Sequence, residues 1–230
     1  MSDELARPET GDEGFVYDID VIRRVEGVTP PKQARSSAML QRILKAMDEL
    51  IREKPFDEIT IPEVAARARC GMAGIYARFK DKASILAALH ETLRSNVLSE
   101  EEICPPEHWD ERSIDDNLRA IVSRLIGYYS SNRNLLSAVL LMKDEGCYQR
   151  AAMNFAQISK VLVERLQERI PDGGQVVDPT AVDVAMRAIF ALLQQRLIFH
   201  PVSIGYKPAL TDEELCEQLV SLLKACIYYR

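Results

Sequence analysis

The sequence of 230 residues predicts an all-α fold. Apolar residues recur at spacings of three and four over most of the chain, as they do on one face of a helix. Residues suited to helix ends interrupt these stretches, and no stretch alternates apolar and polar residues as a half-buried strand does. We therefore expect three short helices near the N-terminus, followed by a larger helical domain.

The first of these helices is expected to begin near residue 35 and to end near residue 54. Pro55 stops it, because the residue before a proline disfavours helical backbone. Phe56 and Ile59 then extend the small core that the helix begins. Its apolar face consists of Leu40, Ile43, Leu44, Met47, Leu50 and Ile51.

A second helix is expected to start at about Ile61. Thr60 has the side chain of an N-cap, and Pro62 falls in the first turn, where a missing N–H does no harm. Glu63 suits the positive end of the helix. Ala65 and Ala68 are small enough to allow a close crossing with the next helix.

A third helix is expected over residues 72–78, after a break at Gly71. Its Ile75 and Phe79 point toward the core of the first two helices. Three short helices that share one core form a helix-turn-helix domain, which holds its last helix against DNA.

Residues 35–89 resemble the DNA-binding domain of the TetR family of bacterial transcriptional regulators. The matching residues are Thr60, Val64, Ala65, Ala68, Ile75, Tyr76, Phe79 and Lys82, followed by Ile85 and Leu86. Arg69 stands where the family usually has glycine, and Gly71 stands where it usually has serine or threonine. An arginine forced to positive φ costs roughly 1–2 kcal/mol. Either the turn therefore changes its geometry, or Cys70 and Gly71 absorb the bend.

The resemblance also implies which residues contact DNA. Tyr76, Lys82, Thr60 and Arg78 are the expected phosphate contacts, and Met72, Ala73 and Gly74 face the base edges. Because residues 72–74 offer no side-chain hydrogen bonds, readout would rest on thymine methyls, on DNA shape, or on arginines such as Arg67 or Arg69.

The distribution of charge agrees with DNA binding at this domain. The net charge of −6 argues against a general nucleic-acid binder. Residues 32–82, however, carry 11 basic and 7 acidic side chains, whereas residues 1–31 carry 3 and 8. Positive charge is thus concentrated where the motif lies. The alternative is an ordinary helical surface of mixed charge.

Other classes of protein find little support in the sequence. No apolar run approaches the ~20 residues of a membrane span, and the N-terminus is acidic, so we expect a cytoplasmic protein. The five cysteines are scattered and the three histidines lie far apart, which argues against disulfides, a metal site or a cofactor. No phosphate loop or nucleophile motif indicates an enzyme.

After residue 83 further helices are expected over residues 84–97, 113–130, 132–143, 148–170, 178–200 and 211–230. Proline and glycine separate them, with loops at residues 100–107, 171–174 and 201–208. Residues 1–31 are expected to form an acidic, flexible arm, although residues 15–24 are apolar enough to fold onto another segment. The expected domains are residues 32–90 for DNA binding and residues 91–230 for effector binding and dimerisation.

The last two helices are apolar on more than one side. In the family that the chain resembles, these helices pack with those of a second subunit, which implies a homodimer and a palindromic operator. The expected interface residues are Arg187, Gln194, Leu219, Val220, Leu223 and Ile227. The alternative is that both apolar stripes are internal to one large domain.

The resemblance further implies a small-molecule effector in the second domain. The candidate lining residues are Trp109, Tyr128, Tyr129, Met142, Met153, Phe155, Phe190 and Gln194. A lining of this kind favours an apolar ligand, although aromatic residues at helical spacing also make ordinary core. The expected function is a transcriptional regulator, most simply a repressor that its ligand releases from DNA. The alternative is a DNA-bound structural or interaction protein that responds to no ligand.

Overall fold

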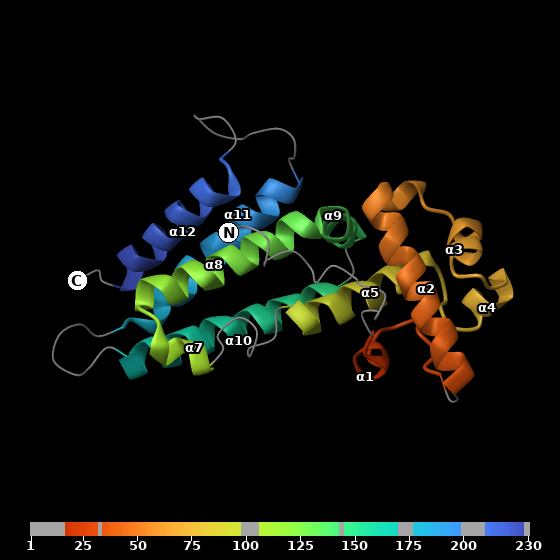
Figure 1. Cartoon of the computed structure of the whole chain (residues 1–230), viewed down its shortest axis with the longest axis horizontal. Helices are drawn as coiled ribbons and strands as arrows, with labels where there is room; N and C mark the ends of the chain where they lie inside the picture. Colours follow the sequence, from red (N-terminus) through yellow and green to blue (C-terminus); the bar gives the residue numbers. More distant parts are fainter. Residues whose placement is uncertain are drawn as a thin grey trace. The chain divides into compact units, whose positions relative to one another are not determined.

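The computed structural model describes residues 17–31, 34–97, 106–142, 145–169, 177–198 and 210–227. Every element in these ranges is helical, apart from one isolated antiparallel bridge between Val28 and Phe79 (Figure 1). The predicted all-α fold is confirmed. The loops expected at residues 171–174 and 201–208 lie outside the described residues, as does Cys104.

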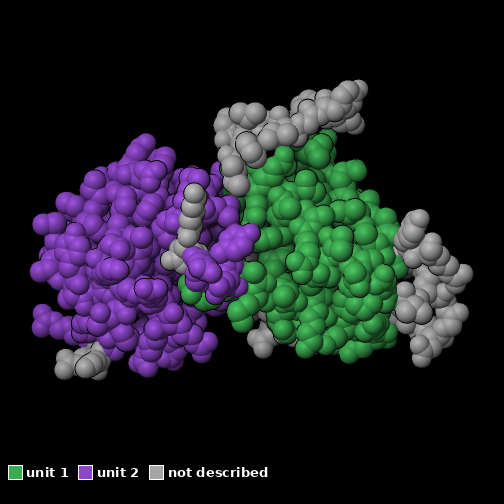
Figure 2. All heavy atoms as spheres, turned by 180° about the vertical axis from the view of Figure 1, so that it is seen from behind, with its two compact units in different colours: residues 1–8, 97–131, 150–230 green, residues 9–96, 132–149 purple. Residues whose placement is uncertain are grey.

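The chain divides into two compact units, which Figure 2 shows in separate colours. The N-terminal unit comprises the described residues of Glu9–Asn96 and Asn132–Gln149, and the C-terminal unit comprises those of Val97–Ser131 and Arg150–Arg230. This division differs from the expected boundary at residue 90. The chain returns to the N-terminal unit after residue 131, and the sequence pattern carries no sign of such a return.

The helix-turn-helix domain has the expected order of elements. Its helices are α2 (Ala34–Glu53), η1 (Phe56–Glu58), α3 (Ile61–Arg67), α4 (Met72–Tyr76) and α5 (Lys82–Val97). Helix α4 is shorter than expected, because Ala77 caps it and the N–H of Arg78 turns back to the carbonyl of Ile75 at 2.9 Å. Ile75 and Phe79 are both fully buried, as the spacing predicts.

Helix α9 (Arg133–Met142) belongs to the same unit and packs against α2 and η1. The side-chain amide of Asn134 donates to the backbone carbonyl of Ile51 at 2.9 Å. Carbonyls in the last turn of a helix have no partner within that helix. Asn134 therefore completes the end of α2, which positions the turn before α3.

A short helix, α1 (Ile19–Ile22), precedes the helix-turn-helix domain. Tyr17, Ile22 and Val25 of this segment are buried. The expected flexible arm over residues 1–31 is therefore wrong for residues 17–31, because buried apolar side chains hold this part of the chain against the domain. This agrees with the expectation that residues 15–24 fold onto another segment, as far as the described residues extend.

The C-terminal unit is built around α8 (Ile114–Ser131), which packs against α11 (Pro179–Ile198) and α12 (Asp212–Ile227). Most of α10 (Glu145–Arg169) belongs to this unit, and α7 (Pro106–Glu111) packs beside α8. The first two residues of α7 fall in the loop expected at residues 100–107, and the rest of the helix lies between that loop and the helix expected from residue 113. Among the described residues, no helix is both long enough and apolar enough to cross a bilayer.

Candidate DNA-binding surface and effector region

The start of α3 is fixed by a reciprocal cap. The backbone N–H of Glu63 donates to the Thr60 hydroxyl at 3.4 Å, and the Glu63 carboxylate accepts from the Thr60 backbone N–H at 2.8 Å. Lys54, at the end of α2, lies 2.6 Å from the same carboxylate. The hydrogen bonds from Lys54 and Thr60 lower the pKa of Glu63 to about 2. The entry into the motif thus depends on an ionised Glu63.

The turn between α3 and α4 settles the geometry around Arg69. The N–H of Cys70 bonds to the carbonyl of Ala65 at 3.0 Å, and that of Arg69 bonds to Ala66 at 3.2 Å, which is a Schellman ending. Such an ending needs a left-handed residue, and Arg69 supplies it with φ of 51°. Gly71 has φ of −78°, which any residue adopts. The arginine therefore carries the strain, and the glycine does not relieve it.

Helix α4 presents an exposed face. Met72 is 51% exposed and Tyr76 is 57% exposed, and Ala73 between them is also exposed. Single exposed apolar side chains are common on protein surfaces, so it is the position of Met72 and Tyr76 together on one face of α4, and not their exposure alone, that marks this face. Because Ile75 on the opposite side is fully buried, one face of α4 packs against the domain and the other face is exposed.

Gly74 lies on the packed side of α4 and is only half exposed. A Cβ at this position would lie 3.0 Å from the sulfur of Met39 on α2. The glycine therefore permits a close approach of α4 to α2. It is less suited to face the bases than Met72 and Ala73.

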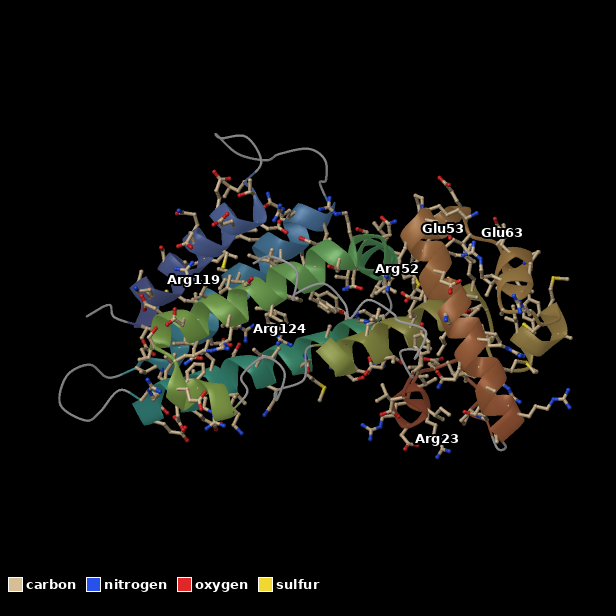
Figure 3. All side chains as sticks on the ribbon, in the orientation of Figure 1. Arg23, Arg52, Glu53, Glu63, Arg119 and Arg124 are labelled. Atoms are coloured by element: carbon tan, nitrogen blue, oxygen red, sulfur yellow. The ribbon has the colours of Figure 1, made fainter. Side chains whose placement is uncertain are left out.

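Arg67 is engaged within the domain. Its two terminal nitrogens lie 2.8 and 3.0 Å from the two carboxylate oxygens of Glu53, which Figure 3 labels at the end of α2. A third contact reaches Glu49 at 3.5 Å. The hydrogen bond from Arg67 lowers the pKa of Glu53, and Glu53 in turn raises the pKa of Arg67.

Two further basic residues of the expected DNA contacts have partners within the domain. Arg78 is half-buried, and one terminal nitrogen donates to the hydroxyl of Ser36 at 2.6 Å. The ammonium of Lys82 donates to the carbonyls of Phe56 and Ile59, each at 2.8 Å. Partial burial lowers the pKa of Lys82. Lys82 thus ties the start of α5 to the turn before α3, and its ammonium also lies 4.2 Å from the centroid of the Phe56 ring.

The structure brings together part of the expected effector region. Four aromatic residues of α8, α10 and α11 form a chain of ring contacts in the C-terminal unit. The ring centroids of Phe155 and Phe190 are 3.9 Å apart, those of Tyr129 and Phe190 are 6.2 Å apart, and Tyr128 lies 5.7 Å from Tyr129.

The other expected effector residues lie elsewhere. Met153 is 72% exposed, and Met142 belongs to the N-terminal unit. Trp109 is buried, where its indole N–H donates to the carbonyl of Arg165 at 3.2 Å, so it fastens α7 to α10. Gln194 is half-buried on α11.

The expected interface residues of α12 are buried within the C-terminal unit. Leu219, Val220, Leu223 and Ile227 are all at most 4% exposed, on a helix that packs against α8 and α11. Arg187, on α11, is exposed and pairs with Asp183 at 2.7 Å. The outer apolar residues of these two helices are instead Val184 and Leu192 on α11, with Leu215 and Leu222 half-buried on α12.

Sequence reasoning missed the contact between the N-terminal segment and the end of α4. The N–H of Thr29 donates to the carbonyl of Arg78 at 2.7 Å, and the N–H of Lys80 donates to Gly27 at 2.9 Å. The apolar residues 15–24 indicate that this segment folds onto another one, but only the glycine at residue 27 marks where the pairing occurs.

Residues 43–89 match the family model described as bacterial regulatory proteins of the tetR family. No curated protein sequence matches the chain. Several solved structures share the fold. A TetR-family transcriptional regulator from Mesorhizobium loti is 16% identical with a TM-score of 0.64, and the alignment covers 84% of this chain and 97% of that one.

Two further structures are similar over most of their length. A TetR/AcrR-family regulator from Thermobifida fusca is 18% identical with a TM-score of 0.55, covering 83% of this chain and 98% of that one. FadR from Bacillus subtilis, in complex with stearoyl-CoA, is 19% identical with a TM-score of 0.50, covering 81% and 97%. Residues 43–89 therefore belong to the tetR family of bacterial regulatory proteins, on a chain that has the fold of TetR-family transcriptional regulators.

Proposed function

We propose that this protein is a sequence-specific DNA-binding regulator of transcription in the cytoplasm, and that it represses until a small, largely apolar ligand releases it. The observation that carries the proposal is the two-sided character of α4. Ile75 is fully buried, while Met72, Ala73 and Tyr76 are exposed on the other side. A helix of a helix-turn-helix held in this way is suited to enter a major groove.

The proposed contacts divide into two kinds. Thr60, Tyr76, Arg78 and Lys82 bind phosphates, which set position and affinity. Met72 and Ala73 meet the base edges, where they favour thymine methyl groups over hydrogen-bonded readout. We leave Arg67 out of the surface, because its guanidinium is paired with Glu53 on two atoms. Gly74 serves the packing of α4 on α2.

We propose that a homodimer binds DNA through two copies of α4. Val184 and Leu192 are 57% and 41% exposed on α11, so an apolar surface of the C-terminal unit is left for a second copy. Two recognition helices about 34–36 Å apart reach successive major grooves of a palindromic site. We therefore place the proposed interface on the outer side of α11 and α12, and not on the residues of α12 that the sequence suggested, because those residues are buried.

We propose that the effector binds within residues 91–200, beside the aromatic residues Tyr129, Phe155 and Phe190. Such rings form an apolar lining, which favours an apolar or aromatic ligand. FadR, which has a similar fold, was solved with stearoyl-CoA, a ligand with a long apolar chain. The acyl chain of that ligand is apolar, as the rings favour, whereas its coenzyme A portion is charged.

Selection of bound DNA from a random pool tests the DNA-binding proposal. A recovered palindrome with half-sites one helical turn apart would support both DNA reading and dimerisation. Since Met72 and Ala73 offer no side-chain hydrogen bonds, the consensus should be modest and should contain A·T pairs within each half-site. A failure to enrich any sequence, or a sharp consensus rich in G·C pairs, would contradict the proposed contacts.

The second candidate is a DNA-bound structural or interaction protein that uses the same fold without a ligand. The paired Phe155 and Phe190 rings are equally suited to a permanent core, and this observation supports that candidate. A specific ligand raises the melting temperature, because it stabilises the state that it binds. A panel of apolar small molecules that leaves the melting temperature unchanged would favour the second candidate.

A further inference from the structure

The N-terminal segment 17–31 is joined to the end of α4 by backbone pairing. Val28 and Phe79 form an antiparallel bridge. The N–H of Thr29 donates to the carbonyl of Arg78 at 2.7 Å, and the N–H of Lys80 donates to the carbonyl of Gly27 at 2.9 Å. These contacts hold residues 78–80, which are three of the five residues between α4 and α5.

The backbone at Gly27 is fitted closely to the start of α5. Its φ of +77° is a left-handed conformation that favours glycine. A Cβ at residue 27 would lie 3.0 Å from the hydroxyl oxygen of Ser84 and 3.3 Å from the Cβ of Lys80. The conformation therefore favours glycine, and a Cβ here would force the side chains of Ser84 and Lys80 to give way by a few tenths of an ångström, which indicates a fitted contact and not a loose linker.

The segment is also anchored at its other end. The side-chain amide of Gln41 on α2 satisfies both backbone groups of Tyr17, accepting from its N–H at 2.9 Å and donating to its carbonyl at 2.5 Å. Ile22 is fully buried. Val25 packs in a cluster with Ala87 of α5 and Cys147 of α10. Residues 17–31 are thus fixed to α2 on one side and to the end of α4 on the other.

We propose that residues 17–31 position the recognition helix α4 for DNA. This rests on the proposed function, in which α4 enters the major groove. Helix α4 has only five residues, and so short a helix has little stability of its own. Its pose depends on what holds its ends. The bonds at Arg78 and Lys80 restrain the C-terminal end, and the cap and turn before Met72 restrain the other.

Loss of this restraint should affect groove contacts more than phosphate contacts. Base edges are read by side chains at fixed places in the groove, whereas long basic side chains adjust to a displaced phosphate. Binding to the operator should therefore weaken more than binding to unrelated DNA. If residues 17–31 only stabilised the fold, variants of this segment that stay folded would bind both the operator and unrelated DNA as tightly as the unmodified protein does.

The first test compares Thr29→Pro with Thr29→Ala in the full chain. Thr29 is exposed, and proline removes the N–H that donates to the carbonyl of Arg78 and also fixes φ near about −65°. Val28 is extended in the bridge, which suits a residue before proline. Alanine keeps the N–H and serves as the matched control.

The second test is Gly27→Ala, with Arg23→Ala as its control. Arg23, labelled in Figure 3, lies on the same segment, and its exposed side chain forms an ion pair with Asp20 at 3.6 Å. Amide exchange at Lys80 reports directly on the bond to Gly27. Circular dichroism establishes the temperature at which each variant is folded, and the affinities are measured there.

We expect Thr29→Pro and Gly27→Ala to lower affinity for the selected operator about tenfold, while affinity for unrelated DNA falls less than about threefold. The two controls should match the unmodified protein. Two outcomes would overturn the positioning role alone. In the first, a variant binds the operator as tightly as the unmodified protein although amide exchange at Lys80 is faster. In the second, a variant loses the same factor of affinity for the operator and for unrelated DNA. If the unmodified protein selects no operator at all, the proposed function itself fails.

Discussion

Arg67 of α3 and Glu53 of α2 form a two-pronged ion pair across the first helix crossing of the motif, with nitrogen to oxygen distances of 2.8 and 3.0 Å. Both groups are near the surface, so solvent screens their attraction. The fixed geometry of the pair nonetheless orients α3 on α2. We regard Arg67 as part of the scaffold that presents α4.

Arg67→Met should therefore lower the melting temperature slightly and leave the DNA consensus unchanged. Glu53→Gln should have a similar effect, and the double variant should lose little more, because each single change already breaks the pair. Lys45→Met, at another exposed basic residue of the domain, is the control. Selection of DNA with the Arg67→Met protein checks whether the consensus is unchanged. An altered base preference within the half-site would show that Arg67 contacts DNA.

Arg69→Gly should stabilise the protein by about 1 kcal/mol. Relief of the left-handed conformation gains roughly 1–2 kcal/mol, and the greater freedom of glycine in the unfolded chain offsets roughly half of that. Chemical denaturation measures the change. Arg69→Ala is the matched control, because it removes the same guanidinium and keeps the Cβ. Equal stabilisation by alanine would show that the side chain, and not the backbone, was the source of the strain.

The sequence predicts those features of the motif that depend on neighbouring residues. The capping residues Thr60 and Glu63 lie three positions apart, and the apolar face of α2 follows from spacing alone, so the sequence predicts both directly. For the turn between α3 and α4, the sequence leaves two possibilities, a changed turn geometry or a bend absorbed by Cys70 and Gly71, and does not decide between them. Which residue takes the positive φ depends on how α3 ends, and the bonds of Cys70 and Arg69 to the carbonyls of Ala65 and Ala66 establish that only in three dimensions.

Contacts between distant residues could not be read from the sequence. Lys82 bonds to carbonyls more than twenty residues away, so its packing role is invisible in a local pattern. The two apolar stripes of α12 pose the same problem. Periodicity shows that both stripes exist, but not that Leu219 and Leu223 are buried within the C-terminal unit.

Lowering the pH should weaken the start of α3. The folded pKa of Glu63 is about 2, below its ordinary value of 4.5, so ionised Glu63 stabilises the fold above about pH 4.5. That contribution is lost as the pH falls from 4.5 toward 2. Glu63→Gln should therefore be less stable than the unmodified protein at pH 6, and the difference should shrink toward pH 2. Thermal melts across this range check it, with Glu58→Gln as the control. A difference that stays constant with pH would contradict the ionised cap.

A charge on the outer side of α11 should separate the proposed dimer. Leu192→Glu places a carboxylate on an exposed apolar position, which costs little in the monomer and much in an apolar interface. We expect light scattering to show a monomer and tight operator binding to be lost. Met153→Glu makes the same kind of exchange on α10 and should leave the dimer intact. Val220→Glu, by contrast, should unfold the C-terminal unit, because Val220 is buried in the protomer.

The unmodified protein supplies the decisive comparison for this prediction. A monomer that binds a palindromic operator tightly would contradict the dimer. If Leu192→Glu stays dimeric while Met153→Glu separates, the interface lies on α10 and not on α11. Both outcomes are distinguishable by mass, without reference to any ligand.

The last prediction concerns the coupling of ligand and DNA. A ligand that releases the protein from its operator must bind the DNA-incompetent state more tightly than the competent one. A coupling of roughly 1–3 kcal/mol would lower operator affinity about 5- to 150-fold. Reciprocity requires operator DNA to weaken ligand binding by the same factor. Titration of a stabilising ligand with and without the operator measures the effect of DNA on ligand affinity, and the reverse titration measures the effect of the ligand on operator affinity.

Phe190→Ala should reduce ligand affinity and leave operator affinity in the absence of ligand unchanged. Equal ligand affinity with and without DNA would rule out the effector role, even for a molecule that binds beside Phe155 and Phe190.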